Sequence, residues 1–227
     1  MKSIGQRMVS LLKQHPILCL LLLIQVGMII YYNLFQGQYY LGYDASTYYL
    51  QAIETWHQKK LLLDHWTWQT TLCWDTPVLL ASLFYGLIGN VFVAMGLANV
   101  IFIALFFGVL YAIMRRLELS DVAMLLCFCI LFTPYMSMPD SANNLQYYFM
   151  MYVDTAAYLV KISIIFFLFY VHDRIQVEGI KKFTACLVVG SYIAILLTSV
   201  SSGYFVLIFG IAPMFVMYIV HGIIQDQ

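Results

Sequence analysis

Charge is scarce in this chain. Only 10% of its 227 residues are Asp, Glu, Lys or Arg, and the mean hydropathy is +0.85. A soluble globular domain carries about 25% charged residues, so the composition excludes that class and indicates a multi-pass membrane protein. The net charge is zero and the basic residues form no run, so the sequence gives no sign of a nucleic-acid-binding surface.

Cysteine, repeats and phosphate-binding motifs are also sparse. Four of the five cysteines fall in apolar segments, and Cys73 alone lies in a polar loop, so no intrachain disulfide is expected there. Cys127-x-Cys129 in an apolar helix is typical of packing rather than of a metal site. His57 and His65 lack the spacing of metal ligands. No internal repeat or glycine-rich phosphate loop is visible.

Long apolar segments are what the chain has in quantity. A membrane-spanning helix needs about 20 such residues, and six segments qualify as expected spans, at residues 17–35, 91–114, 119–135, 147–171, 183–200 and 204–220. Residues 77–88 would make a helix of only about 18 Å, which cannot cross about 30 Å of hydrocarbon. We therefore expect a break at Gly89 and Asn90. The predicted fold is an all-α polytopic module over residues 1–227.

The distribution of Lys and Arg predicts the orientation of this module. Eight of the basic residues precede the first span or fall in loops on that same side, against Lys59 and Lys60 on the other. By the positive-inside rule, residues 1–16 and 221–227 are then cytoplasmic. Residues 36–90 form an external loop with juxtamembrane helices, at the outer face of the plasma membrane.

Residues 36–76 carry all four tryptophans and four of the eleven acids. An amphipathic helix is expected to follow Gly42-Tyr43, with Asp44 at its start. Asp44 as an N-cap and Asp44 as a catalytic carboxylate carry equal weight, and the two roles are compatible. Asp75 precedes Thr76 and Pro77, which favour the start of a second helix. The tryptophans, including Trp74, are more typical of interfacial anchors than of sugar-stacking platforms.

Three further charged residues stand out. Asp140 follows Pro139 at the outer end of the third span and can cap the next helix. Asp154 and Lys161 lie within the fourth apolar segment, seven residues apart, so they share a face of one helix. Inserting a charge at that depth costs about 2.5–3.5 kcal/mol. Two roles are given equal weight: a structural or snorkelling contact, and a polar helix face that reaches an anionic lipid head group.

The order of these pieces resembles the N-terminal membrane module of the glycosyltransferase C superfamily, which includes protein O-mannosyltransferases and aminoarabinose transferases. Four landmarks carry the resemblance, and all occur in the right order: an acid opening the first external loop (Gly42-Tyr43-Asp44), a juxtamembrane helix after a proline motif (Trp74-Asp75-Thr76-Pro77), a helix ending in Arg115-Arg116, and a helix ending in Pro139-Asp140.

The resemblance implies an inverting transferase that takes a sugar from a polyprenyl phosphate to an acceptor hydroxyl, with membrane lipid as its surroundings. Asp44 would be the general base, and Asp75 and Asp140 would hold hydroxyl groups. Tyr43, Tyr48, Tyr49 and Trp74 would line the sugar site, and Lys161 would face the lipid phosphate. The three acids would then border one external cavity. The sugar, the acceptor and any cofactor or metal requirement stay open.

Two departures from the family pattern leave alternatives. Asp44 is followed by Ala45, where many relatives have a second acid, and the chain stops at Gln227 after about six spans. A truncated chain, or a minimal relative that needs a partner chain for the missing spans, would account for the length. Two other functions compete: a non-catalytic membrane subunit or scaffold, and a small transporter using Asp154 and Lys161, although a transporter is expected to show an inverted repeat.

Overall fold

The computed structural model describes residues 4–40, 43–67, 72–134, 151–153, 156–179, 181–201 and 204–225. Every regular element in these ranges is helical, which confirms the predicted all-α class. The elements are α1 (Ile4–Gln14), α2 (Pro16–Tyr31), the π-helical turn η1 (Tyr32–Gln36), the short turn η2 (Gly37–Tyr40), α3 (Tyr43–Gln58), α4 (Val78–Ile88), α5 (Val91–Arg116), α6 (Asp121–Leu131), α8 (Ala157–Glu178), α9 (Lys182–Ser201), α10 (Tyr204–Val206), the π-helical turn η3 (Leu207–Ile211) and α11 (Ala212–Gln225).

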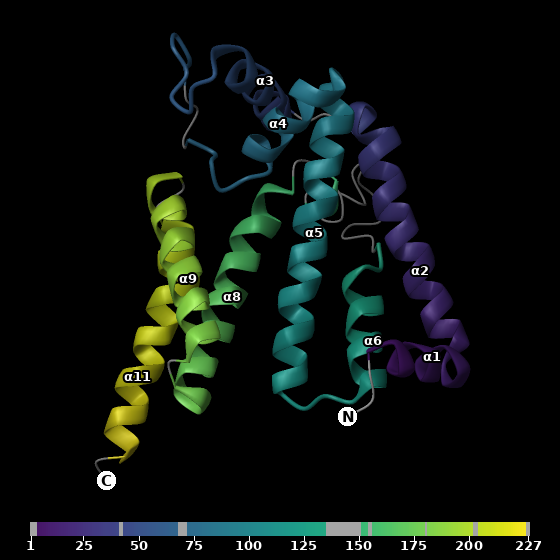
Figure 1. Ribbon diagram of the computed structural model, residues 1–227, viewed down its shortest axis with the longest axis vertical. Coiled ribbons are helices and arrows are strands. Elements are labelled where there is room, and N and C mark those ends of the chain that lie inside the picture. Colours follow the sequence, from purple (N-terminus) through teal and green to yellow (C-terminus); the bar gives the residue numbers. More distant parts are fainter. Residues whose placement is uncertain are drawn as a thin grey trace, which may run out of the picture.

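The longer helices run side by side between two ends of a bundle (Figure 1). Helices α3 and α4 lie together at one end, which is termed the cap end. The described chain begins and ends at the opposite end, termed the terminal end, where α1 lies across the ends of α2 and α6. Both described ends of the chain are therefore on one side of the bundle.

Three helical stretches are long and apolar enough to cross a membrane, namely Pro16–Tyr39, Val91–Arg116 and Phe183–Ser201. They correspond to the first, second and fifth expected spans. Helix α6 is shorter than the span expected at 119–135, and the last segment, Tyr204–Val220, is also one of the shorter apolar helices. The structure thus supports a membrane protein, and the number of six spans stays a prediction.

The fourth expected span does not form one continuous helix in the described residues. Helix α8 begins only at Ala157, because Ala156 has a left-handed backbone with φ of 42°. Lys161 lies in the second turn of α8, and Asp154 lies outside the described residues. The expectation that Asp154 and Lys161 share a helix face therefore stays a prediction.

Helix α5 is the centre of the bundle, because it contacts η1, α3, α4 and α8. Its residues Ile103 and Phe106 join Ile29 of α2 and Leu159 of α8 in the main buried cluster. Phe132, just after α6, is fully buried in the same cluster and stacks on Phe107 with ring centroids 3.9 Å apart. Close packing of this kind holds helices together in a membrane, where lipid tails weaken the hydrophobic contribution.

The chain breaks between α4 and α5 at the predicted position. Gly89 ends α4 with a left-handed φ of 74°, a conformation that glycine adopts without strain. The side-chain oxygen of Asn90 then accepts the backbone N–H groups of Phe92 and Val93 at 3.0 and 3.2 Å, so Asn90 caps α5. Two helices that pack on each other replace one long helix, which confirms the expected break.

Two adjacent arginines fix the terminal end of the bundle. A guanidinium nitrogen of Arg115 lies 3.1 Å from a carboxylate oxygen of Asp121, which opens α6. Arg116 pairs with Asp173 of α8. The last turn of α5 is thereby tied to α6 on one side and to α8 on the other.

Candidate functional site

The cap end is built on α3, the predicted amphipathic helix of the outer loop. Its residues Ala45, Tyr49 and Ala52 are buried against Ala81 of α4 and Met95 of α5. Small side chains at two of these three positions let the helices approach closely. The amphipathic pattern read from the sequence is confirmed, and the apolar face of α3 packs on protein.

Asp44 lies in the first turn of α3, because the helix begins one residue earlier than expected, at Tyr43. The N-terminus of a helix carries a partial positive charge that favours an ionised carboxylate. The side chains of Tyr43 and Asp44 are outside the described residues, as is Asp140. The expected meeting of Asp44, Asp75 and Asp140 in one cavity therefore stays a prediction.

The aromatic residues of α3 make packing contacts. Tyr49 is buried, with its ring 5.3 Å from that of Phe92, and Tyr48 packs against the same cluster while staying half-buried. The ring of Trp56 lies so close to Gly86 that a Cβ there would come within 2.3 Å of it, and the ammonium group of Lys59 covers the ring. Trp56 therefore joins α3 to α4.

Asp75 connects the loop before α4 to the end of α9. The hydroxyl of Ser201 donates to a carboxylate oxygen of Asp75 at 2.7 Å and accepts the Asp75 backbone N–H at 3.1 Å. The backbone N–H of Leu72 donates to the Ser201 carbonyl at 3.2 Å. Asp75 is only 1% exposed. A carboxylate buried in this way is stable only with hydrogen-bond donors around it, so Ser201 is part of its environment.

The residues after Asp75 start α4 much as the sequence predicts. The side-chain oxygen of Thr76 accepts the backbone N–H of Val78 at 3.4 Å, and its hydroxyl donates to the Cys73 carbonyl at 2.5 Å. The regular helix begins at Val78, one residue later than Pro77. The indole N–H of Trp74 donates to the carbonyl of Leu61 at 3.2 Å, which closes the loop onto itself.

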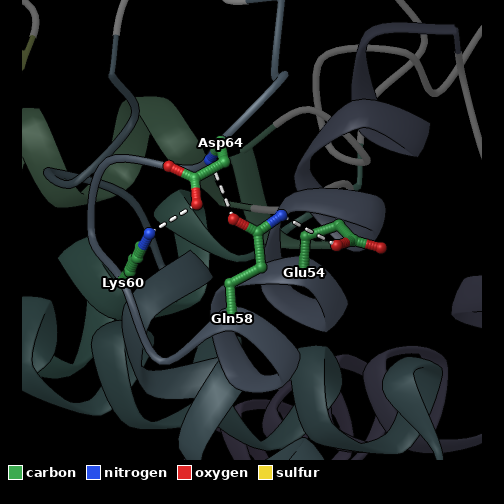
Figure 2. Close-up of polar contacts among 4 residues, drawn as sticks. All are labelled: Glu54, Gln58, Lys60 and Asp64. Carbon is green, nitrogen blue, oxygen red and sulfur yellow. Dashed lines mark hydrogen bonds and ion pairs between the residues drawn. The ribbon is translucent and has the colours of Figure 1, made fainter.

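A second polar group follows the end of α3 (Figure 2). The side-chain amide of Gln58 donates to Glu54 at 3.2 Å and accepts the backbone N–H of Asp64 at 2.8 Å. The ammonium group of Lys60 pairs with the carboxylate of Asp64, and its hydrogen bond and positive charge lower the pKa of Asp64 below the ordinary value of 3.8. The pair is exposed to solvent, so water and salt screen it.

Lys161 is a half-buried cation in the second turn of α8. Its ammonium nitrogen is 5.7 Å from the ring centroid of Tyr158, at the outer limit of a cation–π contact. In the described part of the chain it has no ion pair. Its predicted contact with a lipid phosphate stays a prediction.

Two buried asparagines form a polar centre that the sequence analysis missed. Asn33 in η1 donates to the carbonyls of Ile29 and Tyr152 at 2.9 and 2.7 Å. Asn99 in α5 donates to the side-chain oxygen of Asn33 at 2.9 Å and to the carbonyl of Val153 at 3.0 Å. Because Tyr152 and Val153 precede α8 in the chain, the two asparagines tie η1 and α5 to this segment. Amide side chains inside apolar spans were the available signal, because such groups are costly there unless they bond.

Among the described residues, no group of three His, Cys, Asp or Glu side chains could hold a metal ion. Of the three acids predicted for the site, only Asp75 has a described side chain, and it is buried against Ser201. The layout read from the sequence is the only link to a family. Comparison with known proteins gives no match, neither to a protein-family model nor to a curated protein nor to a solved structure.

Proposed function

We propose that the chain is a membrane-embedded transferase of the glycosyltransferase C type, which moves a sugar from a polyprenyl phosphate to an acceptor hydroxyl at the outer face of the plasma membrane. The observation that carries the proposal is the place of Asp44 in the first turn of α3. Buried Ala45, Tyr49 and Ala52 fix that helix on α4 and α5. A group on a rigid helix is positioned better than one on a loop.

In the proposed reaction Asp44 is the general base. Its carboxylate takes the proton of the acceptor hydroxyl while that oxygen attacks the anomeric carbon of the sugar. The bond from the anomeric carbon to the phosphate oxygen breaks, and the polyprenyl phosphate leaves with the electron pair. Lys161 is the cation assigned to the lipid phosphate, and stabilising that developing charge lowers the barrier. Asp75 holds the outer loop through Ser201.

A second candidate function is a non-catalytic membrane subunit or scaffold. The observation that favours it is the burial of Tyr49 and Asp75, two of the expected site residues, in contacts within the protein. In that case the cap end is a structural platform. Asp44 would then serve only the first turn of α3, where a negative charge is favoured by the helix dipole.

The experiment that separates the two functions is the replacement Asp44→Asn. The full chain is assayed in isolated membranes, which supply acceptor hydroxyls, and polyprenyl-phosphate mannose with a labelled sugar is the probe. A transferase releases free polyprenyl phosphate, and Asp44→Asn reduces that release at least a hundredfold, because it removes the base and keeps a side chain of nearly the same size in the first turn of α3. A scaffold consumes no donor in either form.

Asp64→Asn is the matched control, because Asp64 lies in the same loop but is exposed and paired with Lys60. Its turnover should equal that of the unchanged chain. Equal turnover of Asp44→Asn and the unchanged chain rules out Asp44 as the base. No release by any of the three proteins, across donors carrying mannose or aminoarabinose, leaves the scaffold function.

A further inference from the structure

A deep apolar groove lies at the terminal end of the bundle, away from the cap end. Its cavity volume is about 550 Å³, and its walls come from α1, α2 and α6, with Tyr111 of α5 beside them. Leu12, Leu23 and Phe128 are typical of the lining. Among the lining residues whose side chains are described, Asp121 is the only charged one, and Arg115 pairs with it. The groove therefore suits an apolar occupant without a charge in its buried part.

The position of the groove determines what fills it. One wall is α2, which belongs to a stretch long and apolar enough to cross a membrane. Leu23, which lines the groove, is 70% exposed, so this side of α2 is open to whatever surrounds the bundle. If Pro16–Tyr39 crosses the membrane, the open side faces the acyl chains of the lipid.

The volume of the groove matches one acyl chain. A cavity of about 150 Å³ holds benzene, which has six carbon atoms. At the same ratio, a volume of about 550 Å³ has room for about twenty carbon atoms. A single acyl chain of a phospholipid is of this size.

The charge that follows the lining leucines of α1 in the sequence favours an anionic head group. Leu11 and Leu12 of α1 line the groove, and Lys13 follows them directly, with an exposed side chain. In the described residues Lys13 has no ion pair, whereas Arg115 is already neutralised by Asp121. Lys13 thus contributes an uncompensated positive charge on a short helix beside apolar surface, and such basic sites attract anionic lipids.

We propose that this groove binds one anionic phospholipid, with an acyl chain between α1, α2 and α6 and the phosphate beside Lys13. The lipid comes from the leaflet at the terminal end, so the site is separate from the proposed transferase site at the cap end. A lipid bound in the groove holds α1 against the bundle, because its acyl chain contacts α1 and α2 together.

The experiment measures lipid binding to the full chain purified in detergent, by native mass spectrometry. Phosphatidylglycerol and phosphatidylcholine with identical acyl chains are the probes. We expect one phosphatidylglycerol per chain, bound at least fivefold more tightly than phosphatidylcholine. Lys13→Gln should weaken phosphatidylglycerol binding about fivefold, the effect of one cation on an anionic lipid. Lys181→Gln, an exposed lysine before α9, is the control and should change nothing.

A second pair of variants tests the groove itself. Leu23→Trp places a large ring in the groove from an exposed position, so folding is retained while phosphatidylglycerol binding is lost. Ile193→Trp, at an exposed position of α9, is the control and should bind normally. If Lys13→Gln loses phosphatidylglycerol binding and Leu23→Trp keeps it, the acyl chain does not lie in the groove. If Leu23→Trp loses the binding and Lys13→Gln keeps it, Lys13 does not bind the anionic head group. Equal binding by all variants would leave only general lipid contact and refute the proposal.

Discussion

Gly96 is the position at which the structure predicts the sharpest effect of one methyl group. A Cβ at Gly96 would lie 2.1 Å from the carbonyl oxygen of Asn33, 2.7 Å from its carbon and 3.3 Å from the nitrogen of Leu34. All three are backbone atoms of η1, so no side chain can move aside. A normal carbon–oxygen contact is about 3.3 Å, so Gly96→Ala must push α5 from η1 by about 1 Å.

That displacement has a cost that can be worked out. Forcing extra volume into a packed contact costs about 1–3 kcal/mol. The same shift stretches the 2.9 Å hydrogen bond from Asn99 to Asn33, whose loss adds about 1 kcal/mol. The expected destabilisation is therefore about 2–4 kcal/mol. For a chain of this size each kcal/mol lowers the melting temperature by about 2–4 °C, so Gly96→Ala should melt about 4–16 °C lower.

The assay is thermal unfolding of the purified chain in detergent, followed by circular dichroism. Gly108→Ala is the matched control, because Gly108 is in the same helix, exposed, and has nothing within 4 Å of an added Cβ. Alanine is the better helix former by about 0.5–1 kcal/mol, so this variant should melt at or above the temperature of the unchanged chain. Equal melting temperatures for Gly96→Ala and Gly108→Ala would refute the close contact of α5 with η1.

Three further predictions follow from other contacts. Ser201→Ala removes a donor from the buried carboxylate of Asp75, and should destabilise the chain by about 1–3 kcal/mol in the same thermal assay. Lys60→Met should raise the pKa of Asp64 toward 3.8 in a carboxyl-carbon NMR titration, because Lys60 lowers it. Since the pKa in the folded chain is the lower one, the contribution of this pair to stability is present above pH 3.8 and is lost as the pH falls through the lowered pKa. Cys73 should react with a membrane-impermeant maleimide in intact cells, because the Lys and Arg distribution predicts an external loop.

A different result would contradict each of these three predictions. Ser199→Ala is the control for Ser201, since Ser199 is exposed and bonds within its own helix; equal losses would show that Ser201 acts through helix propensity. An Asp64 pKa that stays low without Lys60 would mean that another group lowers it. Labelling of Cys73 only after the membrane is opened would reverse the predicted orientation.

Local sequence patterns predicted three long apolar helices and the break between α4 and α5. The break at Gly89 and Asn90 was predictable because glycine and asparagine have conformational preferences that act within one turn. The start of α8 at Ala157 was not predictable, because hydropathy continues through that point, whereas the backbone of Ala156 is left-handed. Hydropathy reports how apolar a segment is, and says little about its continuity.

In the candidate site, too, local features were predictable from the sequence and long-range contacts were not. The burial of Ala45 and Ala52 followed from helical spacing in α3. The bond between Asp75 and Ser201 joins residues 126 positions apart, and that between Asn33 and Asn99 joins residues 66 positions apart. Such contacts depend on how whole helices pack, and a single sequence contains no direct signal for them.

The π-helical turn η1 makes the cap end sensitive to the length of the chain. A π-helical turn holds one more residue than an α-helical turn, and each residue of an α-helix advances the chain by about 100°. A π-helical turn takes up its extra residue locally, so losing one residue of η1 other than Asn33 would restore an α-helical turn and leave the following helices in place. A further residue inserted between Tyr32 and Gln36 would instead rotate everything beyond it by about that angle, and α3 would leave α4. Descendants of this gene should therefore tolerate the loss of one residue in η1 better than a gain.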